Sequence, residues 1–311
     1  MNGLPETIPR RHLLLVCLAV LVALAGCAGG GGDGTATETP INTTTPTGPD
    51  NGTTLPQEAS IDNYTAGEGL DSELTPPSEL AVDGETVLSD TLAAIEGVDS
   101  YRLTGNSTIR SQTNNVDQRQ EIRRVTEVDR LRPALTVNST VTARGQTRSQ
   151  QDYYVDGMFY RHSPLLVQQC NSEWAKQNVS ENFTSILQDS DRLTLYNNLL
   201  ENGTASLEGA QTVDGERTYR LRVETDGEAA ASVLGIQNTN SSEAAMITTF
   251  WVDANSSTIV RAEGQVEIVT TAQGQTAVVS GSFVEHVEYG GIEVSLPDSA
   301  ASAVSFSNCG Q

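Results

Sequence analysis

Apolar and polar side chains alternate over much of the chain after residue 100, and this pattern sets the expected fold. Residues 101–109, 218–224 and 259–269 each carry apolar side chains at alternating positions. Such a period predicts strands with one face toward a core and the other toward water. Asp156-Gly157, Asp214-Gly215 and residues 272–274 punctuate these segments and are typical of tight turns. The strands are therefore expected to pair as antiparallel hairpins.

Two stretches show the helical period instead. Their apolar residues share one face and a glycine follows, in Leu88-Leu92-Ile95 before Gly97 and in Leu193-Tyr196-Leu200 before Asn202-Gly203. A third, short helix is predicted over residues 228–236. Between residues 111 and 151 the strands are rich in arginine and glutamine, so their inner face is weakly specified. This order predicts an α+β fold, a long twisted antiparallel sheet with two or three helices against its concave face.

The first 27 residues follow a different pattern. Arg10 and Arg11 precede an apolar run over residues 13–25, which is too short to cross a bilayer stably. A charged start, an apolar run and small residues before a break are the parts of an export signal. Residues 24–27, Leu-Ala-Gly-Cys, resemble the prokaryotic lipobox. Cys27 is therefore expected to carry a lipid, to become the mature N-terminus and to anchor the chain on the extracellular face of the cell membrane.

Two features of this segment leave alternatives open. The apolar run could instead stay as an uncleaved anchor helix, with Cys27 an ordinary buried thiol. The flexible glycine tract at residues 29–32 favours cleavage, because a retained anchor is more often flanked by charges. Arg10-Arg11 before Leu13 and Leu14 also resembles a twin-arginine signal, which exports a chain that has already folded.

Residues 27–77 are rich in Gly, Thr, Pro, Asp and Asn, with few large apolar side chains. Such a stretch cannot bury enough surface to offset its chain entropy. We therefore expect a signal peptide over residues 1–26, a disordered tether over 27–77 and one folded domain over 78–311. N-x-S/T triplets begin at Asn42, Asn51 and Asn63 and recur in the domain, which makes some glycosylation of an exported chain plausible.

Acidic residues outnumber basic ones by 40 to 18, which gives a net charge of −22, and Lys176 is the single lysine. Such a surface repels nucleic acid and anionic headgroups at low salt. Its acidity and its lack of lysine resemble proteins of salt-in halophiles, including haloarchaea, whose surfaces stay hydrated in molar salt. A generic acidic extracellular protein explains the charge equally well, but not the lysine count.

Cysteine chemistry follows from the expected export. Cys17 leaves with the signal and Cys27 carries lipid, so Cys170 and Cys309 remain in the domain. In an oxidising compartment an isolated pair predicts a disulfide that ties the last residues to the body. Two unpaired buried thiols are the alternative.

Catalytic chemistry is poorly represented. His162 and His286 have no Cys, Asp or Glu at metal-ligand spacing, and no nucleophile elbow, phosphate loop or calcium loop is present. Glu285 and His286 are adjacent on a predicted strand, so they point to opposite faces and do not pair with each other. We expect a non-catalytic protein without metal or cofactor; a hydrolase that clusters carboxylates from separate strands is a weaker alternative.

Several landmarks together resemble a known group of proteins. They are the first helix leading into Ser100-Tyr101-Arg102-Leu103, the hairpin 154–160 with Trp174 beyond it, the segment 213–219, Trp251-Val252-Asp253, and the ending from Phe283 to Leu296-Pro297. Over residues 84–298 their order resembles the LolA/LppX/LprG-like lipoproteins. The resemblance implies a half-open barrel that holds an apolar ligand between the sheet and the helices.

That resemblance nominates the side chains that would line a ligand site. They are the apolar faces of the predicted helices and strands, namely Leu88, Leu92, Tyr101, Leu103, Tyr196, Leu200, Tyr219, Leu221, Trp251 and Phe283. The same residues would also serve simply as a core. Two functions stay open: a membrane-anchored binder of a lipid or other hydrophobic ligand, and a structural or sensor-associated lipoprotein with a filled core and a protein partner.

Overall fold

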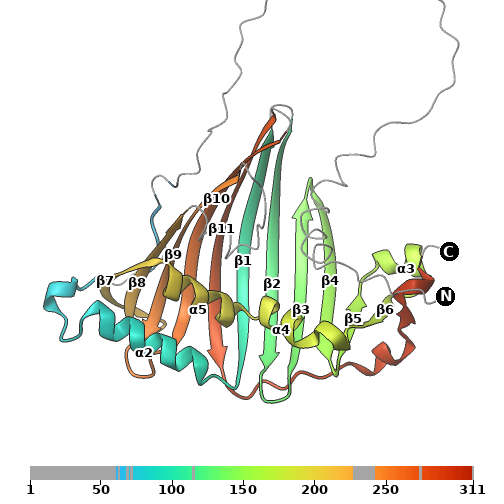
Figure 1. Cartoon of the computed structure of the whole chain (residues 1–311), viewed down its shortest axis with the longest axis horizontal. Helices are drawn as coiled ribbons and strands as arrows, with labels where there is room; N and C mark the ends of the chain where they lie inside the picture. The colour runs from blue at the N-terminus through green and yellow to red at the C-terminus, as the bar shows by residue number, and fades with distance from the viewer. Residues whose placement is uncertain are drawn as a thin grey trace, which may run out of the picture. The chain divides into compact units, whose positions relative to one another are not determined.

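The computed structural model describes residues 61, 64–67, 70, 73–113, 116–226, 242–272 and 275–309. These residues form one sheet of 12 strands in the order β12-β6-β5-β4-β3-β2-β1-β11-β10-β9-β8-β7 (Figure 1). Neighbouring strands are antiparallel except β6 and β12, which are parallel. The end strands β7 and β12 do not pair with each other, so the sheet is open. The predicted α+β fold with a long, half-open sheet is confirmed.

The elements have the following bounds. The strands are β1 (Ser100–Thr113), β2 (Asp117–Asp129), β3 (Ala134–Ala143), β4 (Gln146–Val155), β5 (Met158–His162), β6 (Trp174–Asn178), β7 (Thr204–Val213), β8 (Glu216–Asp226), β9 (Ser242–Asp253), β10 (Ile259–Ala272), β11 (Gln275–Tyr289) and β12 (Val304–Ser305). The helices are α2 (Gly84–Glu96), α3 (Leu165–Cys170), α4 (Phe183–Ser190) and α5 (Arg192–Asn202), with 3-10 turns η1 (Pro77–Glu79), η2 (Ser180–Asn182), η3 (Asp298–Ser302) and η4 (Phe306–Asn308).

The predicted hairpin turns have the backbone that their residues favour. Asp156 and Gly157, between β4 and β5, have φ angles of 52° and 74°. Asp214 and Gly215, between β7 and β8, have φ angles of 51° and 88°. Two successive positive φ values match the twist of an antiparallel hairpin, and Asp-Gly adopts them at low cost. These turns fix the register of both hairpins.

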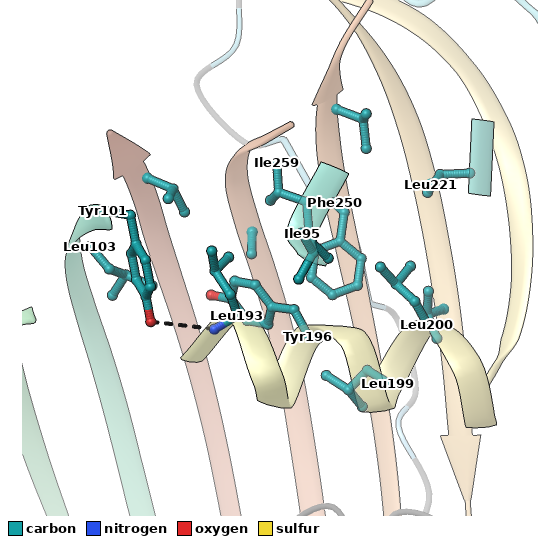
Figure 2. Close-up of a cluster of buried hydrophobic side chains, with 14 of the residues drawn as sticks. Ile95, Tyr101, Leu103, Leu193, Tyr196, Leu199, Leu200, Leu221, Phe250 and Ile259 are labelled. Atoms are coloured by element: carbon teal, nitrogen blue, oxygen red, sulfur yellow. Dashed lines mark hydrogen bonds between the residues drawn. The ribbon is translucent and has the colours of Figure 1, made fainter. Parts of the chain in front are cut away.

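Helices α2 and α5 cover one face of the sheet, called here the inner face. Both helices and α4 cross the strands near one end, and β1, β2, β10 and β11 extend well beyond them (Figure 1). The aspartates Asp83 and Asp191 cap α2 and α5 by accepting hydrogen bonds from backbone N–H groups of the first turn. Figure 2 shows α5 laying Leu193, Tyr196 and Leu200 against the strands.

The opposite, outer face of the sheet has a smaller cluster of its own. Trp251 is fully buried there with Ala66 and Val213, and Val260 packs beside them. The sequence pattern puts Val260 on the same face as Ala262, and this detail is wrong. The register of β10 against β9 shifts between Ile259 and Arg261, so Val260 is the extra residue of a bulge. Ile259 therefore turns into the inner core and Val260 joins the outer cluster.

Packing onto the sheet begins before Ser78, the predicted start of the domain. The hydroxyl of Tyr64 donates to the backbone oxygen of Glu263 at 3.0 Å, and Ala66 is buried against the outer face. Thr75 pairs with Ala210 of β7. Tyr64, Ala66 and Leu70 supply this contact with the outer face. The boundary of the packed residues therefore lies at or before Tyr64.

The predicted disulfide between Cys170 and Cys309 is present and closes a sequence separation of 139 residues. It joins the end of α3 to the segment after η4 and holds β12 beside β6, where Ser305 pairs with Lys176. A loop of this length corresponds to about 4–5 kcal/mol of stabilisation in the chain-entropy model, as an upper value.

Several predicted features lie outside the described residues. They are the export signal with Arg10 and Arg11, the lipid attachment at Cys27, most of the tether, and the third helix over residues 228–236. Within the part of the chain that the structure describes, no helix is both long and apolar enough to span a bilayer.

Candidate functional site

The inner face brings together nine of the ten side chains predicted to line a ligand site. They belong to, or pack against, one hydrophobic cluster: Leu88, Leu92, Tyr101, Leu103, Tyr196, Leu200, Tyr219, Leu221 and Phe283. The tenth, Trp251, lies on the outer face, because its strand neighbours Phe250 and Val252 point inward and side chains alternate along a strand.

Burial separates these nine residues into two groups. Tyr101, Leu103, Tyr196 and Leu221 have no accessible surface, and Leu200 retains 2%. A side chain without accessible surface borders no space that admits a water molecule, so these residues fill the core beneath the helices. The other four are half-buried and lie around that core: Leu88, Leu92, Tyr219 and Phe283.

Beyond the helices the inner face still carries apolar side chains, and these are only half-covered. We call the half-exposed residues there the distal inner face: Ile109, Ile122, Val141, Val266, Ile268, Val279 and Phe283. They lie on the adjacent strands β3, β2, β1, β11 and β10. Ile122 pairs with Val141, and Ile109 and Val266 both pair with Gly281, so apolar side chains are neighbours across the strands. Polar side chains lie among them, because Ser107 stands between Ile122 and Phe283, and Gln120 and Arg124 share the inner face of β2 with Ile122.

A buried ion pair lies where the distal inner face meets the core. The carboxylate of Glu285, 6% exposed, accepts hydrogen bonds from Nη2 of Arg192 at 3.0 and 2.9 Å through its two oxygens. The hydroxyl of Tyr196 donates to the same carboxylate. Gly105 faces Glu285 across the strands, and a Cβ there would come within 2.7 Å of the Glu285 Cγ. The glycine therefore makes room for the buried acid.

A second polar group secures the start of α5. Asp191 accepts hydrogen bonds from the hydroxyl of Tyr101 at 2.7 Å and from Nε of Arg130 at 2.8 Å. The same carboxylate accepts from the backbone N–H of Leu193 at 2.9 Å, and Arg192 N–H donates to the Tyr101 oxygen at 3.0 Å. One acid thus ties α5 to β1 and to the end of β2.

The buried environment changes the acid–base behaviour of these groups. Burial, followed by the charge of Glu285, raises the pKa of Tyr196 well above its usual value. Burial and the charge of Asp191 do the same to the pKa of Tyr101. Burial lowers the pKa of Arg192, but the carboxylate of Glu285 more than offsets this, so the pKa is raised. Both tyrosines therefore keep their protons and donate hydrogen bonds at neutral pH, and Arg192 stays charged.

The ion pair also contacts the apolar surface. The Arg192 guanidinium lies 5.8 Å from the ring centre of Phe283 and 5.7 Å from that of Tyr196. Phe283 belongs to the distal inner face, so the charged centre and the apolar surface are contiguous. The arrangement can hold an apolar chain against the strands while the Arg192–Glu285 pair keeps α5 in place.

The two histidines lie apart from this centre. His286 is on the outer face, 3.5 Å from Nη1 of Arg261, while its neighbour Glu285 points inward, as the strand alternation predicts. His162 Nε2 lies 3.5 Å from a carboxylate oxygen of Glu173, and its ring is tilted by 32° against that of Trp174. Among the described residues no three His, Cys, Asp or Glu side chains gather into a metal-ligand set.

Sequence reasoning missed the polar centre. Arg192 and Glu285 are separated by 93 residues, and Tyr101 and Asp191 by 90. The helix-capping position of Asp191 and the alternation of β11 were readable signals, since they place Asp191 at a helix start and Glu285 on the inner face. Neither the cap position nor the strand alternation identifies the distant side chain with which each acid pairs.

Ionisation of the buried tyrosines gives a pH dependence. Burial is the main cause that raises the pKa of Tyr64 to about 12. It also raises the pKa values of Tyr101, Tyr196 and Tyr289 above their usual range. Above pH 10 the unfolded chain releases these protons while the folded chain keeps them, so stability falls as the pH rises. Urea unfolding between pH 8 and 12 should show constant stability up to about pH 9.5, then a loss of up to about 1.4 kcal/mol per pH unit for each tyrosine.

A Tyr64→Phe variant measures the contribution of Tyr64 to this loss of stability at high pH. It should lessen the fall in stability between pH 10 and 12 by about 1 kcal/mol per pH unit on average, because phenylalanine has no proton to release. Unchanged stability of the unmodified chain up to pH 11.5 would refute the raised values.

Comparison with known proteins gives the following results. No family model and no curated protein matches the chain. Similar solved structures include the lipoprotein LppX of Mycobacterium tuberculosis, at 16% identity and a TM-score of 0.38 over 68% of this chain and 99% of LppX. LprF from Mycobacterium bovis is 12% identical, with a TM-score of 0.39 over 73% of this chain and 99% of LprF. A DUF1329 family protein from Desulfovibrio piger is 12% identical, with a TM-score of 0.23 over 70% and 96%. LppX is a member of the group that the sequence resembles.

Proposed function

We propose that the chain binds a lipid, or another ligand of similar hydrophobic character, on the distal inner face and does so without catalysis. The supporting observation is the group of half-exposed apolar side chains on one face of five adjacent strands, in a chain with a net charge of −22. Exposed apolar side chains that lie together on a protein surface often mark a binding site, whereas single scattered ones are common and need no explanation.

The size of this surface suits an extended hydrocarbon chain. Five strands span four intervals of about 4.8 Å, which gives a width of about 19 Å. Each methylene group that leaves water for this surface contributes about 0.8 kcal/mol. The adjacent Arg192–Glu285 pair holds α5, the helix that borders the surface.

Membrane anchoring through Cys27 is part of the same proposal. A lipid on Cys27 would hold the domain at the extracellular face of the membrane, where lipid is the nearest hydrophobic ligand. The resemblance of residues 24–27 to the lipobox supports this placement.

A second function is favoured by one specific observation. Five of the predicted lining side chains have at most 2% accessible surface, which suits a filled core. A non-catalytic envelope lipoprotein with such a core would use its surface for a protein partner. The two functions differ in whether the distal inner face binds hydrocarbon.

A matched pair of variants on β2 tests the binding proposal. Ile122 lies on the distal inner face and Val125 on the outer face of the same strand, and both are half-buried. Titration of the full chain with cis-parinaric acid, followed by its fluorescence, should give saturable binding. Ile122→Asn should weaken that binding about tenfold, which corresponds to about 1.4 kcal/mol, whereas Val125→Asn should leave it within about twofold.

Two results would count against the proposal. One is an unmodified chain that binds the probe without saturation. The other is equal weakening by both substitutions while circular dichroism shows both variants folded.

A further inference from the structure

A hollow of about 540 Å³ lies at the β6–β12 edge of the sheet. Its lining residues are Met158, Lys176, Gln177, Asn178, Ser305, Phe306 and Ser307. Strands β5 and β6 supply four of them, and the C-terminal segment 305–307 supplies the other three. Sites for small molecules have volumes of about 300–1,000 Å³, so the hollow is of suitable size. None of the ten side chains nominated from the sequence borders it.

The charge of this hollow is opposite to that of the chain. Its lining contains Lys176 and no carboxylate, although the chain has 40 acidic residues and a net charge of −22. Within the described part of the chain, the Lys176 ammonium has no hydrogen bond or ion pair. By contrast, the half-buried Arg161 and Arg192 are each paired with a carboxylate. The lysine therefore presents an uncompensated positive charge to the hollow.

The remaining lining combines apolar and neutral polar groups. Met158 pairs with Asn178 and Lys176 pairs with Tyr160, so Met158 and Lys176 lie on the same face of the sheet, and Met158 supplies the apolar surface. Phe306 stacks on Phe159 with a ring separation of 5.8 Å, so its ring lies on the opposite face. Ser305 pairs with Lys176 across the strands, and its hydroxyl hydrogen-bonds the Ser307 hydroxyl at 2.8 Å. A lysine is a compact point charge that binds carboxylate and phosphate groups.

We infer that this hollow binds a small, free organic anion with an apolar body, such as a medium-chain carboxylate, with the anionic group at Lys176 and the body against Met158. This site is separate from the distal inner face and does not depend on the function proposed for it.

The disulfide makes the site dependent on oxidation. Three lining residues lie within four positions of Cys309, whose bond to Cys170 holds the C-terminal segment against β6. Loss of that bond frees one wall of the hollow. Octanoate binding at Lys176 should therefore be lost in a Cys309→Ser chain.

Lys176 can be observed by itself, because the chain contains one lysine. Reductive methylation of the full chain with ¹³C-formaldehyde keeps the positive charge and labels Lys176 and the N-terminal amine. Titration with sodium octanoate should shift the Lys176 methyl resonance to saturation, whereas inorganic phosphate at equal ionic strength should produce no saturable shift. Calorimetry should show octanoate binding weakened about fivefold or more by Lys176→Gln and nearly retained by Lys176→Arg.

Controls separate this site from the other one. The saturable Lys176 shift should survive Ile122→Asn and disappear in Cys309→Ser. A shift that grows linearly with octanoate, or that occurs with phosphatidylglycerol vesicles and not with octanoate, would overturn the inference. Equal octanoate affinity of the Lys176→Gln chain and the unmodified chain would overturn it as well.

Discussion

Replacing Arg192 by leucine is expected to lower the free energy of unfolding by about 3–5 kcal/mol, because it leaves a buried carboxylate without its cation. Glu285 is 6% exposed, and Arg192 supplies hydrogen bonds to both of its oxygens. Leucine cannot donate to either oxygen, and Tyr196 alone cannot satisfy them. Urea denaturation followed by circular dichroism at pH 7 measures the loss.

Two companion variants show whether the loss comes from the orphaned acid. Removing both charges, in Arg192→Leu with Glu285→Met, should restore more than half of the lost stability, since an apolar pair often replaces a buried ion pair at little cost. Arg102→Leu breaks the exposed contact with Glu127 and should cost less than about 1 kcal/mol. If the double variant is no more stable than Arg192→Leu, the stated cause is wrong.

Substitution of Cys27 by serine should move the protein from the membrane fraction to the medium. A thioether-linked lipid anchors through its buried methylene groups, at about 0.8 kcal/mol each, and serine cannot carry that link. Immunoblotting of washed membranes and of the medium measures the change. The membrane-bound share should fall to background.

Cys17→Ser is the matched control for this experiment. Cys17 lies within the residues that the export signal is expected to remove, so this variant should remain membrane-bound. A Cys27→Ser chain that stays in the membrane fraction would show instead that the apolar stretch is an uncleaved anchor.

Local chemistry made much of the fold predictable. The Asp156-Gly157 and Asp214-Gly215 turns have the positive φ values that this dipeptide favours, and the hairpins around them follow. The helical stripe beginning at Leu88 corresponds to α2, and Gly97 ends that helix. These features depend on neighbours within a few residues, which is the range over which a single sequence is informative.

Features that depend on distant partners were not predictable in the same way. The bulge at Val260 arises from the match between β10 and β9, and it reverses the faces of Ile259 and Val260. The role of Glu285 depends on a guanidinium 93 residues away. The apolar pattern likewise nominated Leu103 and Leu221 as ligand-lining residues, although both are fully buried in the core. Inward-facing apolar residues give the same sequence pattern whether they fill a core or line an open site.

The most direct test of hydrophobic-ligand binding is mass spectrometry of organic extracts from the full chain, purified in parallel with the Ile122→Asn and Val125→Asn variants. We predict a reproducible hydrophobic compound in near-equal amounts from the unmodified chain and from Val125→Asn, and much less from Ile122→Asn. Extracts that contain no such compound, from protein that also fails to bind cis-parinaric acid saturably, would contradict ligand binding at the distal inner face.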